Sequence, residues 1–232
     1  MRAVAGPPFL TDDPDVVDFH HYELFLIPFT MVEAGGDYGV QAPGVELNMG
    51  VLVPNLQLHA VVTGAENLPR GGVNTAGIGD TELGVEYRFI QEGKHRPMVA
   101  TYPMVEAATG NPELGLGNGA TYYHLPVWAQ KSFGSWTTYG GADYTINHAP
   151  GAKNNLSLGW ELQKQITKTL WLGGEVFHQG QDLTTDHSAT FADLGGGLAL
   201  NKSQSWTLLF SGGHTFLGDQ RAEGYLSFVY AF

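Results

Sequence analysis

The chain has 232 residues, of which 32 are glycine, 12 are proline and none is cysteine, and its formal net charge is −12. The absence of cysteine excludes disulfides, thiolate metal sites and thiol nucleophiles, and an apolar content of 43% excludes a disordered chain. With 11 basic residues scattered along the sequence, a nucleic-acid-binding surface is not expected. The longest apolar run, residues 24–29, is far shorter than the roughly 20 residues of a membrane-spanning helix.

Residues 1–18 are the first element that the sequence predicts. This stretch contains Pro7-Pro8 and Thr11-Asp12-Asp13-Pro14, and proline and aspartate are both unfavourable in a strand. We therefore expect a periplasmic N-terminal segment over 1–18 that is separate from the domain over 19–232. Two forms of this segment remain open, a small plug folded into the mouth of that domain and a disordered tail.

From residue 20 onwards, apolar and polar residues alternate with a period of two, which is typical of a strand with two different faces. Leu83, Val85 and Tyr87, for example, alternate with glycine and glutamate. The predicted strands are 20–32, 43–53, 56–64, 79–90, 97–107, 119–130, 136–147, 155–165, 169–179, 189–201, 205–216 and 223–232. Most of them are longer than the usual five or six residues and reach the roughly 9–11 residues of a tilted membrane strand.

The connections between these strands alternate in length. Short turns are predicted at 54–55, 91–96, 131–135, 166–168 and 201–204, and long loops at 33–42, 64–78, 108–118, 148–154, 180–188 and 217–222. Short turns on one rim and long loops on the other are typical of outer-membrane barrels. The sequence therefore predicts an all-β fold, a 12-stranded antiparallel up-and-down transmembrane β-barrel over 19–232, with both chain ends on the short-turn, periplasmic side.

Two groups of residues bear on how the barrel wall is built. Pro28, Pro103 and Pro126 fall inside predicted strands, and because proline cannot donate to a ladder, we expect bulges or shifted registers there. A set of aromatic residues lies at or near the predicted short turns, where an interfacial girdle is expected. This set consists of Phe133, Trp136, Tyr139, Trp171 and Trp206.

Acidic residues occupy the polar face of half of the predicted strands. A charge facing lipid at mid-depth costs about 2–4 kcal/mol, so these acids are expected to line the lumen, with Arg88 as the main base among them. The acids are Glu46, Glu82, Glu86, Asp143, Glu161, Glu175 and Asp193. A water-filled acidic lumen attracts cations, which predicts passive diffusion of ions or small solutes. The alternative is a packed interior in which the acids are paired and nothing is conducted.

Three large aromatic residues, Trp128, Trp171 and Phe177, are expected to narrow the same lumen. They favour a second hypothesis, an uptake channel for small hydrophobic or aromatic compounds, in which the aromatic side chains matter more than the acids. A third interpretation is that they only fill space.

The last strand ends in an alternating apolar face that includes Phe228, Tyr230 and Phe232. This ending resembles the C-terminal signal read by the insertion machinery of the bacterial outer membrane. The resemblance implies an outer-membrane location, with membrane lipid and, during assembly, the insertion machinery as partners.

Signals for catalysis or for a cofactor are weak. Gly115-x-Gly117-x-x-Ala120 precedes a predicted strand instead of a helix, so it does not predict a dinucleotide site. The histidines, among them His59 and His124, are scattered and predict no metal ligand or catalytic base. An outer-membrane enzyme remains as the weakest hypothesis, and no cofactor or metal is expected.

Several stretches resemble the transporter-like outer-membrane barrels grouped under the phenol-degradation meta-pathway name. These stretches are 7–14, 79–84, 115–119 and 130–141. The resemblance implies an outer-membrane channel or transporter, with small aromatic or hydrophobic molecules as one class of solute. It assigns no substrate-binding residue.

Overall fold

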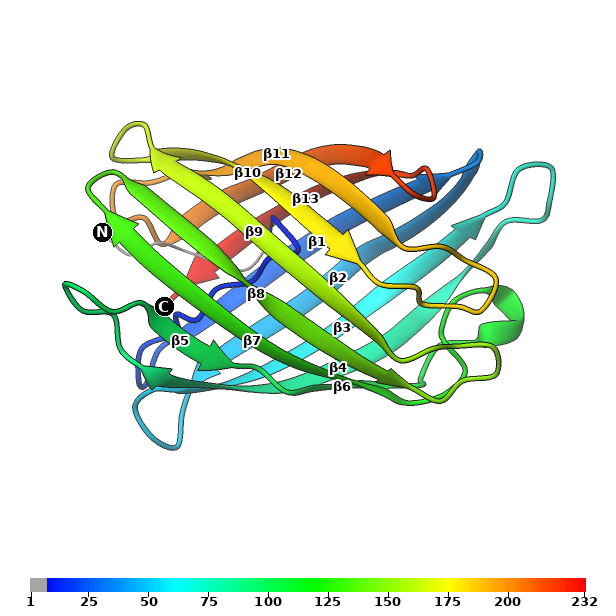
Figure 1. Cartoon of the computed structure of the whole chain (residues 1–232), viewed down its shortest axis with the longest axis horizontal. Coiled ribbons are helices and arrows are strands. Elements are labelled where there is room, and N and C mark those ends of the chain that lie inside the picture. The colour runs from blue at the N-terminus through cyan, green and yellow to red at the C-terminus, as the bar shows by residue number, and fades with distance from the viewer. Residues whose placement is uncertain (1–7) are drawn as a thin grey trace.

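Every strand runs antiparallel to its neighbours in the computed structural model, which describes residues 8–232 (Figure 1). The strands are β1 (Tyr22–Ala34), β2 (Asp37–Gly50), β3 (Leu56–Leu68), β4 (Thr75–Ile90), β5 (Met98–Thr101), β6 (Met104–Ala107), β7 (Tyr122–Phe133), β8 (Trp136–Asn147), β9 (Asn155–Gln165), β10 (Leu170–Gln179), β11 (Ala189–Ala199), β12 (Trp206–Leu217) and β13 (Ala222–Ala231). β5 and β6 both pair with β4 and with β7, so they are two halves of one strand. The barrel therefore has twelve strands, as predicted.

The barrel is closed by pairing between the first strand and the last. β1 pairs with β13 from Glu23–Ala231 to Glu33–Ala222. At the end of this ladder, Tyr22 N donates to Phe232 O at 2.9 Å and Phe232 N donates to Tyr22 O at 3.0 Å. The sheet consequently has no free edge, the condition for a β-structure to exist in lipid.

Helical structure is confined to one 3₁₀ turn, Pro112–Leu114, among the described residues. In the part of the chain that the structure describes, no helix is both long and apolar enough to cross a membrane.

The connections at the two ends of the barrel, here called the turn rim and the loop rim, are close to the predicted lengths except between β1 and β2 and between β3 and β4, where they are shorter than predicted. The turn rim contains the connections 51–55, 91–97, 134–135, 166–169 and 200–205, and the loop rim contains 35–36, 69–74, 108–121, 148–154, 180–188 and 218–221. The predicted long loop 33–42 is wrong, because β1 and β2 meet at a two-residue turn. Its residues Gly35 and Gly36 have φ of 63° and 94°, as the tight hairpin turn with two positive φ angles requires. The loop predicted at 64–78 shrinks to 69–74, because β3 and β4 stay paired from Gly64–Ile78 to Asn67–Thr75.

The three prolines within the predicted strands disturb the ladders in different ways. The β1–β13 register shifts between Leu26 and Phe29, around Pro28, and Pro103 lies in the break between β5 and β6. Pro126 keeps its register in β7. Its carbonyl accepts from Tyr102 N at 3.4 Å, and because the N and O of a strand residue point to the same side, its missing N–H faces the β5–β6 break.

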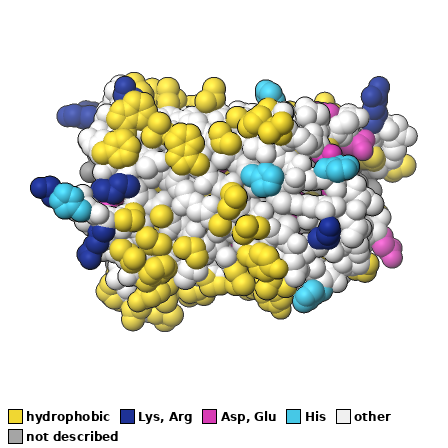
Figure 2. All heavy atoms as spheres, viewed as in Figure 1, with side chains coloured by type: hydrophobic (Ala, Val, Ile, Leu, Met, Phe, Trp, Pro, Cys, Tyr) yellow, Lys and Arg dark blue, Asp and Glu magenta, His cyan; other side chains and the backbone are white. Residues whose placement is uncertain are grey.

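Apolar side chains cover the outside of the barrel between the two rims. Figure 2 shows hydrophobic side chains over much of one face, with most lysines and arginines near the two ends. The outward residues of β4, which are Leu83, Val85, Tyr87 and Phe89, are 40–49% exposed. A belt of this kind matches the hydrocarbon of a bilayer and would be a liability in water.

An aromatic cluster occupies the turn rim, as predicted, but its membership differs. Trp206, Tyr230, Phe232 and Tyr22 stack in series, with ring centroids 4.7, 5.2 and 5.4 Å apart. Phe133 and Trp136 are also exposed at this rim, whereas Tyr139 and Trp171 are buried inside the barrel and do not belong to the girdle. Closeness to a turn does not determine the face of a strand residue, because the face alternates at every position.

Leu158→Arg and Ser157→Arg form a matched test of the barrel's two faces. Leu158 is 47% exposed on the apolar outside, whereas Ser157 is 6% exposed and lies opposite Asp143 on the inside. We expect Leu158→Arg to lower the free energy of unfolding by about 2–4 kcal/mol, and Ser157→Arg to lower it much less. Denaturant titration in lipid vesicles measures both values, and equal losses would contradict the assignment of faces.

Candidate functional site

The N-terminal segment, residues 8–18, lies inside the barrel, and residues 19–21, whose side chains are exposed, connect it to β1. Figure 1 shows this stretch in dark blue, running within the cylinder before β1 begins. Phe9, Thr11, Asp13, Val16 and Val17 are all buried. The first seven residues of the predicted 1–18 segment lie outside the described residues.

Four strands of the wall contact this segment through hydrogen bonds. Glu175 of β10 accepts from Leu10 N at 3.1 Å and from Thr11 N, and Ser211 Oγ of β12 donates to Pro8 O at 2.5 Å. The bonds are distributed around the circumference, so the segment crosses the lumen instead of following one strand.

The same segment is bound to β3 and β4 by one ion pair and by a hydrogen bond to a side-chain amide. Gln57 Oε1 of β3 accepts from Val17 N at 2.8 Å. Arg88 of β4 forms an ion pair with Asp15, and its other nitrogens donate to Asn55 Oδ1 at 2.8 and 3.2 Å. Arg88, predicted as the lumen base, is therefore directed at the segment.

On the side of these contacts that faces the turn rim, apolar side chains fill the lumen. Phe9 packs in one buried cluster with Phe25, Trp171, Leu209 and Val229, and its ring centroid lies 6.4 Å from that of Trp171. Trp171, predicted to narrow the lumen, lies in this cluster beside Phe9 of the segment.

Between the segment and the loop rim lies a cavity of about 540 Å³, which reaches the loops of that rim. Nine carboxylate side chains line it, and no lysine or arginine of residues 8–232 does so. The nine are Asp12, Asp13, Asp15, Glu23, Glu46, Glu82, Glu86, Asp143 and Asp182. The cavity is therefore strongly acidic, and it is the candidate functional site.

The structure separates the seven predicted lumen acids into two groups. Glu46, Glu82, Glu86 and Asp143 line the cavity. The other three, Glu161, Glu175 and Asp193, are buried and lie side by side in register on β9, β10 and β11. Glu175, the middle member of that row, is the group that binds the backbone of the N-terminal segment.

Of the predicted constriction aromatics, Trp128 and Phe177 line the cavity. Both are buried, and they pack with Phe191 in a second apolar cluster. The rings of Phe177 and Phe191 are stacked with centroids 5.5 Å apart. One wall of the cavity is therefore aromatic, while the wall formed by β2, β3 and β4 is acidic.

His59 is the centre of a hydrogen-bonded group on the acidic wall. Its Nε2 lies 2.6 Å from Glu82 Oε1 and its Nδ1 lies 2.7 Å from Asn48 Oδ1, while Asn48 Nδ2 donates to Glu46 Oε1 at 3.0 Å. The His59 ring also meets the ring of Tyr102 edge-on, with centroids 5.2 Å apart. This group holds two of the cavity carboxylates in fixed positions.

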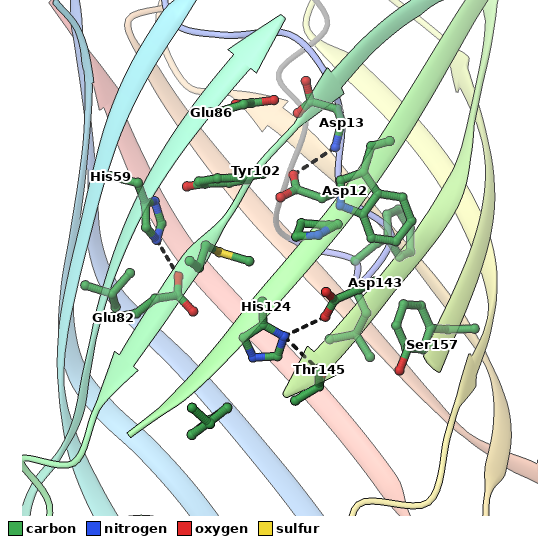
Figure 3. Close-up of a pocket in the computed structure, with 18 of the residues that line it drawn as sticks. Asp12, Asp13, His59, Glu82, Glu86, Tyr102, His124, Asp143, Thr145 and Ser157 are labelled. Carbon is green, nitrogen blue, oxygen red and sulfur yellow. Dashed lines mark hydrogen bonds and ion pairs between the residues drawn. The ribbon is translucent and has the colours of Figure 1, made fainter. Parts of the chain in front are cut away.

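His124 forms a similar group on β7 and β8 (Figure 3). Its Nδ1 lies 2.5 Å from Asp143 Oδ2 and 3.2 Å from Thr145 Oγ1. In a catalytic triad the acid and the nucleophile contact different nitrogens of the histidine. Here both partners contact the same nitrogen, so this group does not have the geometry of a triad.

The N-terminal segment adds acids whose ionisation depends on this environment. Burial raises the pKa of Asp12 to about 7, with a contribution in the same direction from the carboxylates of Glu46 and Glu82. At the loop rim, burial also raises the pKa of Asp182. The negative charge of the cavity therefore grows as the pH rises through neutrality.

Sequence reasoning missed His59, Tyr102 and His124 as cavity residues. His59 lies two residues from Gln57 and His124 lies four from Trp128, and all four face inwards. The period of two would have placed both histidines in the lumen, although it would not have paired them with Glu82 and Asp143. Among residues 8–232, no group of three or more histidine, aspartate or glutamate side chains is arranged to hold a metal ion.

No family model and no curated protein matches this chain, but several solved structures share its fold. An outer membrane channel from Pseudomonas putida F1 is 14% identical, with 95% of this chain and 98% of that chain covered and a TM-score of 0.75. The KdgM porin is 9% identical, with 90% and 99% covered and a TM-score of 0.62. The translocator domain of the autotransporter NalP from Neisseria meningitidis is 14% identical, with 95% and 90% covered and a TM-score of 0.57. At these identities the likeness shows the barrel fold.

Because the chain has no cysteine, a disulfide can test whether the segment occupies the lumen. A Cβ built on Gly159 of β9 would lie 3.0 Å from Thr11 Cβ, which is shorter than the 3.5–4.5 Å of natural disulfides, so the segment must move away from β9 by about 0.5 Å or more for the bond to form. We expect the double variant Thr11→Cys/Gly159→Cys to oxidise in the folded barrel, as measured by a mass loss and by protection from maleimide. Each single variant is the control, and full maleimide labelling of the folded double variant would contradict the placement.

Proposed function

We propose that this chain is a bacterial outer-membrane channel through which small solutes diffuse passively, with a preference for cations. The observation that carries the proposal is the acidic cavity inside a closed barrel with an apolar exterior. The exterior supports a location in lipid, and the solved barrels of similar fold include an outer membrane channel and a porin. Assembly by the outer-membrane insertion machinery would then use the C-terminal strand with Phe228, Tyr230 and Phe232.

The preference for cations follows from the balance of charge. Nine carboxylates border the cavity, and Arg88, the base predicted among them, is occupied by Asp15 and Asn55. Within low-dielectric walls such a charge excess produces a negative potential that concentrates cations and repels anions.

In this proposal the N-terminal segment is a gate. Phe9 and the apolar cluster around it fill the lumen near the turn rim, so a solute that reaches the cavity from the loop rim meets the segment next. The segment is held by a few hydrogen bonds, one ion pair and the burial of apolar side chains such as Phe9. None of these contacts belongs to the ladders of the wall, so the segment can be displaced without unfolding the barrel.

Uptake of small aromatic or hydrophobic molecules, the role implied by the resemblance to the phenol-degradation barrels, is the second candidate. The aromatic wall formed by Trp128 and Phe177 favours it. Liposome swelling with phenols and with sugars of similar size separates the two functions, because an aromatic uptake channel would admit phenols preferentially.

Planar-bilayer recording in a potassium chloride gradient tests the channel and its charge preference. We expect a reversal potential that shows potassium passing more readily than chloride. The double variant Glu46→Gln/Glu86→Gln is expected to reduce the potassium-to-chloride permeability ratio by roughly half or more. Asp219→Asn is the control, because Asp219 is exposed on a loop away from the cavity and pairs with His187. A preference for chloride would overturn the acidic-lumen argument.

The disulfide between positions 11 and 159 also tests the gate. In Thr11→Cys/Gly159→Cys the oxidised protein holds the segment in the lumen, so we expect its conductance to be lower than that of the reduced protein. Deletion of residues 8–15 is expected to raise conductance by about twofold or more, because it removes Phe9 and its cluster from the path. If the oxidised, reduced and shortened proteins all conduct equally, the segment is not a gate.

A further inference from the structure

We propose that the cavity is a binding site for a protonated organic amine with a compact aromatic body. This inference rests on the proposed channel function and names the class of solute that the lumen selects. It depends on a contiguous wall in which Glu86, Tyr102 and Trp128 occupy three successive strands and face Asp12 and Asp13 of the N-terminal segment.

The pairing of the strands places these three side chains next to one another. Arg88 of β4 pairs with Ala100 of β5, and Ala100 pairs with Trp128 of β7. Continuing the first register sets Glu86 opposite Tyr102, and Trp128 is the diagonal neighbour of Tyr102, two residues along β7 from the position opposite it. All three side chains line the cavity. Figure 3 shows Glu86, Tyr102, Asp12 and Asp13 gathered at one end of the site.

Two buried oxygens in this wall have no hydrogen-bond partner among the described residues. They are Glu86 Oε1 and Tyr102 Oη, in side chains of residues that are 3% and 5% exposed. A buried carboxylate without a donor is unfavourable, so the wall is complementary to a ligand that brings N–H groups. An alkylammonium group supplies three of them together with a positive charge.

The position of the Tyr102 hydroxyl is fixed in advance. Its ring packs edge-on against His59 and lies over Gly84, where a Cβ would be only 2.7 Å from Tyr102 Cε2. Because glycine at position 84 has no side chain, the Tyr102 ring can occupy this space. Because the Tyr102 hydroxyl is already held in place, it loses little conformational entropy when it accepts a hydrogen bond from a ligand.

The aromatic wall distinguishes an organic cation from an inorganic one. Trp128 and Phe177 line the same cavity and pack together with Phe191. Aromatic faces attract ammonium groups through cation–π interactions and bury apolar bodies, but they supply none of the oxygen ligands that hard metal ions require. Together with the absence of a metal-binding group in residues 8–232, this favours an amine over a divalent cation.

The remaining classes of solute fit the cavity less well. An anion would be repelled by the nine carboxylates, and a neutral aromatic compound would gain no charge–charge attraction from them. A volume of about 540 Å³ lies within the range of sites that hold one small molecule. The combination of carboxylates and neighbouring aromatic rings in one cavity is therefore matched best by an arylalkylammonium ion.

The test uses 2-phenylethylammonium as the probe and titration calorimetry on the folded full-length chain in a zwitterionic detergent. We expect saturable binding of this probe, and at least about tenfold weaker binding of three comparison compounds. These are 2-phenylethanol, which lacks the charge, phenylacetate, which reverses it, and n-butylammonium, which lacks the ring. Equal binding of the neutral alcohol and the amine would overturn the proposal.

Variants locate the binding on this wall. Glu86→Gln and Trp128→Leu are each expected to weaken binding by about tenfold, and Tyr102→Phe, which removes only the hydroxyl, by a few-fold. Asp219→Asn is the matched control and should bind like the parent chain. A difference in gel mobility between unboiled and boiled samples shows that each variant is folded. Unchanged affinity in folded Glu86→Gln and Trp128→Leu would overturn the site.

Single-channel recording separates the failure of this site from the failure of the channel. Calorimetry requires no conduction, so binding without any ion current would keep the amine site and contradict the channel. Potassium current that 2-phenylethylammonium does not reduce, together with absent calorimetric binding, would keep the channel and contradict the amine site.

Discussion

The structure depends on one constraint, which is that every backbone N–H and C=O of the wall must find its partner within the protein. Lipid offers no hydrogen bonds, so a sheet can exist there only when its first and last strands pair. The ladder between β1 and β13 satisfies this condition. Once the cylinder is closed, each strand has one face toward the outside and one toward the lumen. The apolar belt and the acidic interior are therefore two consequences of the same closure.

A wall that is one strand thick also determines how the interior is stabilised. Polar side chains that point inwards cannot reach the bulk solvent beyond the rims, so they bind one another and the N-terminal segment. His59 joins Glu82 and Asn48 on the acidic wall, and Glu175 accepts two backbone N–H groups of the segment. The segment has no regular structure of its own, and its position comes from these side chains.

The fold could be predicted largely from the sequence, because period-two alternation assigns both the strands and their faces. The positions of the turns were harder to predict from the sequence. The pair Gly35-Gly36 lies between Glu33-Ala34 and Asp37, where the alternation ends, so the sequence predicts a loop here although the hairpin continues to a two-residue turn. Tyr139 and Trp171 show a different error, since their distance from a turn suggested a girdle whereas their register places them inside.

The candidate site was harder to predict, since it depends on side chains that meet across the barrel. The inward acids of regular strands follow from alternation, but their division into cavity acids and segment-binding acids does not. That division depends on where the N-terminal segment crosses the lumen, and a segment rich in proline and aspartate has no periodicity that would reveal its path. Tyr102 lies at the β5–β6 break, where the alternation itself is interrupted by Pro103.

One irregular place in this barrel, the break between β5 and β6, coincides with the candidate site. Pro103 and Pro126 interrupt one ladder at the level of Tyr102, and Gly84 removes the neighbouring side chain, so the phenol ring can lie against the wall. A regular strand here would present a continuous ladder and one more side chain to the lumen. Local departures from the regular strand pattern are tolerated where surrounding pairing over-determines the fold, and they are concentrated at functional sites. In this chain, the regular part of the sheet provides the closed wall, and its one interrupted strand shapes the face on which a solute would bind.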